Sequence, residues 1–166
     1  MSEANVRVLV TGPAWMGAGI GSIETALKRL LGGAREDIAI TAYSLSGSAD
    51  PLFEWIEAAL MRGVRVKLIF NKLSRLKKSA RSRLDLLAKD YPHFHLYDFA
   101  DKQTYDLHAK AVVADRQKAI VGSSNLSVGG FIGNHEMAIM VEGSAAASVA
   151  KVIERLLKSS YAMRTP

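Results

Sequence analysis

Residues 108–136 decide both the fold and the chemistry of this chain, and they read HAKAVVADRQKAIVGSSNLSVGGFIGNHE. His108 and Lys110 stand two residues apart at the start of an apolar run. On a strand, side chains two residues apart point to the same face. The pattern therefore predicts an imidazole beside an ammonium. A buried ammonium is costly unless an anion binds there, which makes this pair the leading candidate for a functional site.

A polar break at residues 115–118 separates this run from a second apolar segment, which predicts a β-hairpin. The second strand would carry Ser123 and Asn125 back to His108 and Lys110. One imidazole, one ammonium and two neutral polar side chains then converge. That set suits a phosphoryl group, because it offers a nucleophile, a cation and hydrogen-bond donors to the phosphate oxygens.

The stretch resembles the signature of the phospholipase D superfamily, His-x-Lys-x4-Asp-x6-Gly-Ser-x-Asn, and matches it without a gap. The resemblance implies a phosphodiesterase that works through a phosphohistidine intermediate, with no metal or other cofactor. It places Asp115 among the catalytic residues. The position of Asp115 at a hairpin turn, where aspartate is favoured for backbone reasons alone, favours a structural role instead.

The resemblance also predicts a role for each of the other motif residues. His108 would attack phosphorus, and Lys110 would bind the phosphate together with Ser123 and Asn125. Glu136 fits the downstream acid that family members use to hold the histidine. It would accept a hydrogen bond from the far ring nitrogen of His108, which fixes the tautomer and stabilises the imidazolium.

Only one copy of the motif is present, and members with one copy typically build the active site across a homodimer. The leaving oxygen needs a proton, and a second histidine is the natural donor. We therefore expect a homodimer with a shared active site, in which His108 of another subunit supplies that proton. His135 is the alternative within the chain, but it neighbours Glu136 and would face the opposite way on a strand. His93 and His95 are interpreted as structural, because no third ligand is spaced to complete a metal site.

The composition is that of a globular protein. The chain has 166 residues, of which 49% are hydrophobic, and we expect one domain over residues 1–166. No apolar run approaches the roughly 18–20 residues that span a bilayer, and the first residues lack the pattern of a signal peptide. Cysteine is absent, which removes disulfides and thiolate metal sites. We expect a cytoplasmic protein with no stable membrane association.

The charge favours an anionic partner, because the formal net charge is +6 and the isoelectric point is near 9.7. Six basic residues gather in a segment without an acid and are called the basic cluster below: Lys72, Arg75, Lys77, Lys78, Arg81 and Arg83. The cluster follows a predicted strand, and ligands of open α/β sheets bind beyond the carboxyl ends of strands. We therefore expect it to bind nucleic acid; the alternative is a solvated helix face.

The rest of the chain predicts an α/β fold. Ser22 is expected as a helix N-cap, Asp50-Pro51 as the start of a second helix, and Gly63 as its end. The predicted order is strand 7–11, helix 23–31, strand 37–44, helix 50–63, strand 64–70, helix 76–89, strand 94–99, the motif hairpin, strand 136–141 and helix 145–158. Alternating strands and helices favour a parallel sheet with covering helices. With the resemblance, they predict a single-domain α/β/α sandwich with a mixed β-sheet.

The leading functional hypothesis is a small nuclease, an endonuclease-type hydrolase of DNA or RNA. The alternatives are a phospholipid hydrolase or phosphatidyltransferase, and a non-catalytic nucleic-acid-binding subunit. Lipid chemistry would need an apolar lip, and the suitable loops carry few apolar residues. An intact motif argues against a vestigial site. Phosphate-facing charges do not specify bases, so the sequence leaves DNA and RNA equally open.

Overall fold

The computed structural model describes residues 5–15, 17, 19–45, 51–100, 105–127, 130 and 133–166. Its strands are β1 (Val6–Thr11), β2 (Gly21–Ser22), β3 (Asp37–Ala42), β4 (Arg65–Asn71), β5 (Phe94–Phe99), β6 (Lys110–Ala114), β7 (Lys118–Gly122), β8 (Glu136–Glu142) and β9 (Ala162–Arg164). Its helices are α1 (Ile23–Gly33), α2 (Pro51–Met61), α3 (Lys78–Asp90) and α4 (Ser144–Leu157), with a short 3₁₀ turn at Leu73–Arg75.

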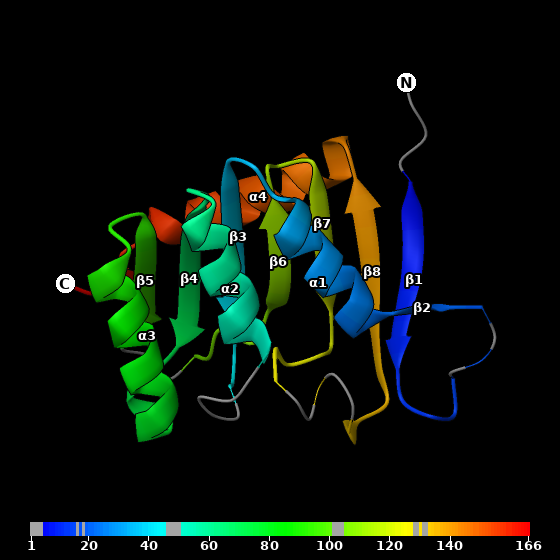
Figure 1. Cartoon of the computed structure of the whole chain (residues 1–166), viewed down its shortest axis with the longest axis horizontal. Helices are drawn as coiled ribbons and strands as arrows, with labels where there is room; N and C mark the ends of the chain where they lie inside the picture. The colour runs from blue at the N-terminus through cyan, green and yellow to red at the C-terminus, as the bar shows by residue number, and fades with distance from the viewer. Residues whose placement is uncertain are drawn as a thin grey trace.

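All nine strands belong to one mixed sheet, in the order β2-β1-β8-β7-β6-β3-β4-β5-β9. Helices α1, α2 and α3 cover one face of this sheet, and α4 lies on the other (Figure 1). The predicted α/β/α sandwich with a mixed sheet is confirmed.

The parallel part of the sheet consists of β3, β4 and β5. Helices α2 and α3 make the two crossovers, as parallel pairing requires. These strands are apolar on both faces, since Leu68 and Ile69 on β4 are both fully buried although they point in opposite directions. Helix α2 begins at Pro51 and is followed by Gly63, as predicted, while its expected cap Asp50 lies outside the described residues.

The antiparallel part carries the motif. Strands β6 and β7 form the predicted hairpin, with Lys110 opposite Gly122. Strand β8 pairs with β7, and β1 pairs with β8. Strand β6 also pairs antiparallel with β3, which joins the two parts of the sheet. The amino end of β6 therefore lies at the same edge as the carboxyl ends of the parallel strands.

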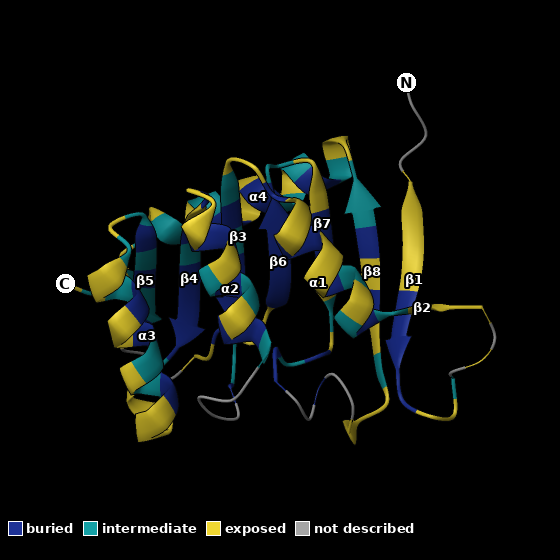
Figure 2. Ribbon diagram, viewed as in Figure 1, coloured by how far each residue is buried: buried dark blue, intermediate teal, exposed yellow. Residues whose placement is uncertain are grey.

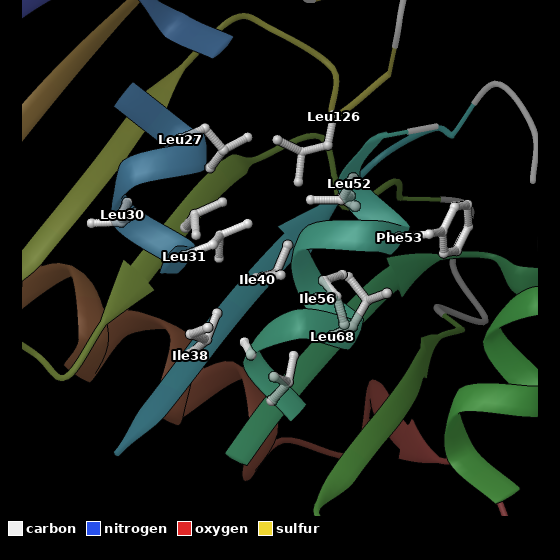
Figure 3. Packing of buried hydrophobic residues seen from close by; sticks show 14 of the residues in the cluster. Leu27, Leu30, Leu31, Ile38, Ile40, Leu52, Phe53, Ile56, Leu68 and Leu126 are labelled. Atoms are coloured by element: carbon white, nitrogen blue, oxygen red, sulfur yellow. The ribbon is translucent and has the colours of Figure 1, made fainter. Parts of the chain in front are cut away.

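Two apolar cores hold the layers together. The larger core lies between the sheet and helices α1 to α3, and the smaller one lies under α4. Helix α1 begins where Ser22 accepts a hydrogen bond from the Thr25 amide (3.3 Å), as predicted. Its buried side chains, Leu27 and Leu31 among them, meet the sheet beside α2 (Figure 3). Figure 2 shows the buried positions concentrated on the strands between the two helix layers.

Two strands were not predicted from the sequence. Strands β2 and β9 have two and three residues, and they extend the sheet at its two edges. Segments this short carry no readable periodicity.

Candidate active site

Apart from Asp115, the motif residues gather at one edge of the sheet, the lower edge in Figure 1. At this edge β3 and β7 end, and β6 and β8 begin. Lys110, Gly122 and Ala138 lie side by side across three of these strands. The hairpin register thus brings the segment after β7 next to the start of β6, as the sequence predicted.

Lys110 is the most unusual residue of the site, since it is a lysine only 7% exposed. Its Nζ atom donates a hydrogen bond to the carbonyl oxygen of His108 (2.8 Å) and lies 3.0 Å from His108 Nδ1. Burial lowers the pKa of Lys110, while the negative charge of Glu136 acts in the opposite direction. The chain therefore holds a largely desolvated ammonium against an imidazole, which is an arrangement suited to an anion.

His108 lies outside the strand, which corrects one prediction. Strand β6 begins at Lys110, so the two residues do not share a strand face. The side chains still meet, because the Lys110 ammonium folds back onto the segment before β6. The exposed His108 ring packs against Tyr43, with ring centroids 4.4 Å apart and planes tilted by 56°. Tyr43 also lies under the ammonium, 5.1 Å from Lys110 Nζ to the ring centroid, at a distance typical of cation–π contacts.

Glu136 occupies the site but does not hold His108. Its carboxylate accepts hydrogen bonds from the Ser123 hydroxyl and from Asn134 Nδ2 (3.4 Å). The predicted hydrogen bond between Glu136 and His108 is not formed among the described residues, and that prediction is wrong for the single chain. The cause is the position of His108 before β6, where its ring packs against Tyr43 instead.

Gly122 lets β7 and β8 pack closely at the site. A Cβ atom at this position would lie 2.5 Å from the carbonyl oxygen of Met137 and 2.6 Å from the Cβ of Ala138. Only glycine fits this approach of β7 to β8. The glycine of the signature is therefore explained by packing next to Lys110.

The segment after Gly122 is anchored from both sides. The buried Ser124 hydroxyl donates to the carbonyl oxygen of Gly130 (2.9 Å), and Leu126 points into the core under α1 and α2 (Figure 3). Asn125 lies between these anchors, and its buried Oδ1 atom has no hydrogen-bond partner in the part of the chain that the structure describes. Unsatisfied buried polar atoms are rare and often mark functional positions. The free group of Asn125 is thus a hydrogen-bond acceptor, and only its Nδ2 group could donate to a phosphate oxygen.

Asp115 does not join the site. It lies beyond Ala114, at the opposite end of β6 from Lys110. Its carboxylate accepts the backbone N–H groups of residues 35, 36 and 37, at 2.8–3.0 Å for the shortest contact of each. Burial alone would raise the pKa of Asp115, but these three donors outweigh it, and the pKa lies below its ordinary value. The geometry assigns Asp115 a structural role and corrects its place among the catalytic residues.

Replacing Asp115 by asparagine should lower stability without changing the chemistry. Hydrogen bonds to a charged group contribute about 1.5–3 kcal/mol, and we expect a loss of that order at pH 7. Because the folded pKa is lowered, the stabilisation is present above about pH 4 and is lost as pH falls through the folded value. Urea unfolding at several pH values should show the two proteins converging in acid. A large fall in kcat with unchanged stability would contradict the structural role.

A polar network that was not predicted fixes the segment leading into the motif. Asn71, at the end of β4, is 1% exposed, and its Oδ1 atom accepts the Leu107 amide (2.8 Å). Its Nδ2 atom donates to Asp106 (3.3 Å). Asp106 also binds Lys72 (2.6 Å) and Arg75 (3.2 Å), and the hydrogen bond from Lys72 is the main cause of its lowered pKa. The signal in the sequence was an asparagine directly after the apolar run at residues 68–70.

The basic cluster is more neutralised than its sequence indicates. Lys72 and Arg75 share Asp106, while Arg81 binds Asp85 and Arg83 binds Glu57. Glu57 and Asp106 are distant in sequence, so the acid-free segment gave no sign of them. Lys77 and Lys78, where α3 begins, make no ion pair with the described residues. Lys72 and Arg75 lie beside the residues that precede His108, whereas Arg81 and Arg83 lie further along α3.

His135 and His93 have structural contacts, whereas the buried Nδ1 atom of His95 has no hydrogen-bond partner among the described residues. His135 Nε2 accepts the Ala14 amide (3.2 Å), and its ring lies edge-on to Trp15. His93 is 2.9 Å from the carbonyl oxygen of Leu60. Within the described residues, no group of three or more His, Cys, Asp or Glu side chains could hold a metal ion. No described helix is long and apolar enough to cross a bilayer.

A large cavity lies away from the motif. It measures about 430 Å³ and is lined by Arg7, Arg29 and Lys118 with apolar neighbours. Arg7 and Lys118 lie at the opposite ends of β1 and β7 from the motif residues. The chemistry of the side chains, and not cavity size, therefore identifies the candidate active site.

Comparison with known proteins decides the family. A model of the family described as "Cardiolipin synthase, PLD-like domain" matches residues 27–158, which include most of the chain and the signature from His108 to Asn125. The chain belongs to the phospholipase D superfamily. The resemblance seen in the sequence is thereby confirmed.

Relatives of this phospholipase D superfamily member have different names. It is 26% identical over 161 residues, 96% of its length, to the DISARM protein DrmC of Bacillus paralicheniformis. It is 27% identical over 145 residues, 86% of its length, to cardiolipin synthase A of Buchnera aphidicola. The chain spans 66% and 28% of the lengths of these two relatives. Among solved structures, the phospholipase D family member Nuc from Salmonella typhimurium matches with a TM-score of 0.78 at 19% identity, covering 98% of this chain and 99% of Nuc. That likeness shows the fold.

Proposed function

We propose that this protein is a metal-independent nuclease that cleaves DNA or RNA through a phosphohistidine intermediate. The observation that carries the proposal is the buried Lys110 ammonium held against His108, beside a segment fixed by two further cations. A resting protein that desolvates a cation next to a nucleophile is prepared for an anionic substrate.

The reaction follows from these positions. The His108 imidazole attacks phosphorus, and the bond from phosphorus to the leaving oxygen breaks as that oxygen takes a proton from a second imidazole. Water then attacks the phosphohistidine and returns a proton to the second imidazole, while His108 departs. Lys110 and the Asn125 amide N–H groups stabilise the charge on the phosphoryl oxygens, and the Ser123 hydroxyl joins them when it turns away from Glu136. Glu136 holds Ser123 and lowers the cost of the charged Lys110.

Nucleic acid is favoured over lipid by the charges near His108. Lys72 and Arg75 are held beside the entry to the motif by Asp106, and Lys77 and Lys78 are exposed where α3 begins. A nucleic acid carries a phosphate at each step along its backbone and so benefits from several cations in a row. Lipid chemistry is the second candidate, because the matching family model and one relative carry the name cardiolipin synthase.

One parallel assay separates these functions. The purified protein should be incubated with end-labelled DNA, labelled RNA and a phospholipid vesicle, each with EDTA present. The proposal expects cleavage of nucleic acid in chelator and none of the lipid. Lipid hydrolysis alone would replace it by the second candidate. Activity that EDTA abolishes and magnesium restores would remove the metal-independent mechanism.

The mechanism needs two imidazoles, and we propose that a second copy of the chain provides the second. Among the described histidines, only His108 is in contact with Lys110. His135 contacts Ala14 and Trp15 instead. A two-fold axis is the simplest way to place two copies of one residue face to face.

An exposed apolar stripe offers a surface for that second copy. It runs across β1, β8 and β7 on the sheet face turned away from α1, and its side chains are 40–54% exposed: Val6, Val8, Val121, Met137 and Ile139. Ile139 pairs with Val8 on one side and with Val121 on the other, so the stripe is continuous across three strands. Its lower end, Met137, adjoins Glu136 of the site. Continuous apolar patches of this kind are typical of protein interfaces.

A mixing experiment tests the shared site. Wild-type chains are co-refolded with His108→Ala chains, and activity on a natural phosphodiester is measured against the wild-type fraction. A site that needs both histidines predicts activity proportional to the square of that fraction, so about a quarter remains at half wild type. A linear plot, from chains shown by tag exchange to have mixed, would mean that each subunit works alone.

The basic cluster can be tested with a matched pair of variants. We expect Lys77→Ala/Lys78→Ala to weaken DNA binding and to make its salt dependence less steep. The magnitude of the negative slope of log K against log salt should fall by about 0.7–0.9 for each phosphate that is no longer neutralised. Arg81→Ala/Arg83→Ala removes the same charge from residues already paired with acids, and should change the slope less. Equal slopes in all three proteins would favour a solvated helix face.

A further inference from the structure

A cavity of about 140 Å³ lies beside Tyr43, the residue whose ring packs against His108. It is lined by Tyr43, Ser44, Leu45, Phe70, Asn71, Arg75 and Leu76, which come from the ends of β3 and β4 and the turn before α3. Because the Tyr43 and His108 ring centroids are 4.4 Å apart, one wall of this cavity is in contact with the proposed nucleophile.

The lining of the cavity is divided by chemistry. Its floor is apolar, since Leu45 and Phe70 are buried in the main core. Its polar lining residues are Ser44, Arg75 and Asn71, of which Asn71 is buried and already hydrogen-bonded to Leu107 and Asp106. Asp106 fixes two of these groups, because it binds both Asn71 Nδ2 (3.3 Å) and Arg75 (3.2 Å). An aromatic wall, an apolar floor and a fixed polar rim form a site suited to a flat heteroaromatic ring.

We propose that this cavity holds the nucleobase of the nucleotide adjoining the scissile phosphate; this rests on the proposed nuclease function. A base is joined to its phosphate through one sugar, so a phosphate at His108 brings the base close to Tyr43, which contacts His108 and lines the cavity. Aromatic side chains and arginine planes are the usual stacking partners of unpaired bases. The cavity therefore selects single-stranded or locally unpaired substrate, because a paired base cannot enter it.

The polar rim favours a base over the other apolar occupant, an acyl chain. An acyl chain would cover Ser44 and the guanidinium N–H groups of Arg75 that do not bind Asp106 without offering them hydrogen bonds, which is unfavourable for polar groups. A base has donors and acceptors along its edge and satisfies such groups.

Filling the cavity tests the proposal. Leu76 is partly buried at its margin, so Leu76→Trp and the milder Leu76→Phe place an aromatic ring inside. Leu86→Trp is the matched control, because Leu86 lies on α3, is 48% exposed and does not line the cavity. The substrates are the 3′- and 5′-(4-nitrophenyl) phosphates of thymidine, with methyl and hexadecyl 4-nitrophenyl phosphate for comparison. The two thymidine isomers also report which side of the phosphate the bound base is on.

Filling should lower kcat/KM for at least one thymidine ester by about 5- to 150-fold, mainly through KM, which corresponds to the stacking of a single base. The methyl ester and the Leu86→Trp control should be unaffected. Equal loss on all esters, or no loss on either thymidine ester, would overturn the proposal, and so would loss on the hexadecyl ester alone. Failure of the nuclease function is distinguishable, since the wild-type protein would then cleave neither DNA nor RNA whatever the Leu76 variants do.

Discussion

His108→Ala should abolish turnover of a natural phosphodiester, with a fall in kcat of roughly a thousandfold or more. His108 is the only described histidine beside the Lys110 ammonium, and removing the nucleophile of a covalent mechanism leaves only the binding contribution. Substrate binding should persist, because Lys110 and the neighbouring cations remain. The measurement is single-turnover cleavage of a DNA or RNA strand labelled at the scissile phosphate.

Rapid quenching under alkaline conditions should trap labelled protein from the wild type and none from His108→Ala. The control is His93→Ala, since His93 contacts Leu60 on the other side of the chain's core and should leave the rate unchanged. A His108→Ala protein that still turns over at a tenth of the wild-type rate would rule out the phosphohistidine mechanism.

Lys110→Met should give a protein that is more stable and nearly inactive. Loss of one charge that stabilises developing negative charge typically lowers kcat by about 10²–10³-fold. The side chain is 7% exposed, so methionine fills the same space without desolvating a charge, and we expect the free energy of unfolding to rise by about 1 kcal/mol. Thermal unfolding and kcat measured on the same preparations check both effects.

The gain in stability should depend on pH. Burial lowers the pKa of Lys110, so the unfolded chain binds more protons than the folded one between the folded pKa and about pH 10.4. The free energy of unfolding of the wild type therefore rises with pH through that window. The difference in this free energy between Lys110→Met and the wild type becomes smaller. Lys118→Met is the matched control, because its side chain is 54% exposed and should show neither effect. A Lys110→Met protein that is clearly less stable than wild type at pH 7 would contradict this view of the site.

The layers of the fold could be predicted because each depends on local patterns. The parallel strands are apolar runs, and the helices between them have one apolar face and clear ends at Ser22 and Gly63. The edge strands β2 and β9 exist through pairing with β1 and β5, so their few residues carry no pattern of their own.

The site could be predicted only in part, for a different reason. The hairpin register fixes Lys110 opposite Gly122, and spacing along the sequence reveals it. The contacts of His108 with Tyr43, and of Glu136 with Ser123, depend on where β6 begins and on side-chain packing between distant segments. Spacing likewise identified Asp115 as a member of the signature but not that its carboxylate binds backbone amides far from the nucleophile.

The buried ammonium also has an evolutionary consequence. Most substitutions at catalytic positions are removed by selection only while the activity is needed. Replacing Lys110 by an apolar residue should immediately raise the free energy of unfolding. In a lineage no longer selected for catalysis, Lys110 should therefore be replaced sooner than the solvent-exposed His108. Homologues that have an apolar residue at the position of Lys110 but keep a histidine at the position of His108 should thus be proteins that lost catalytic activity recently.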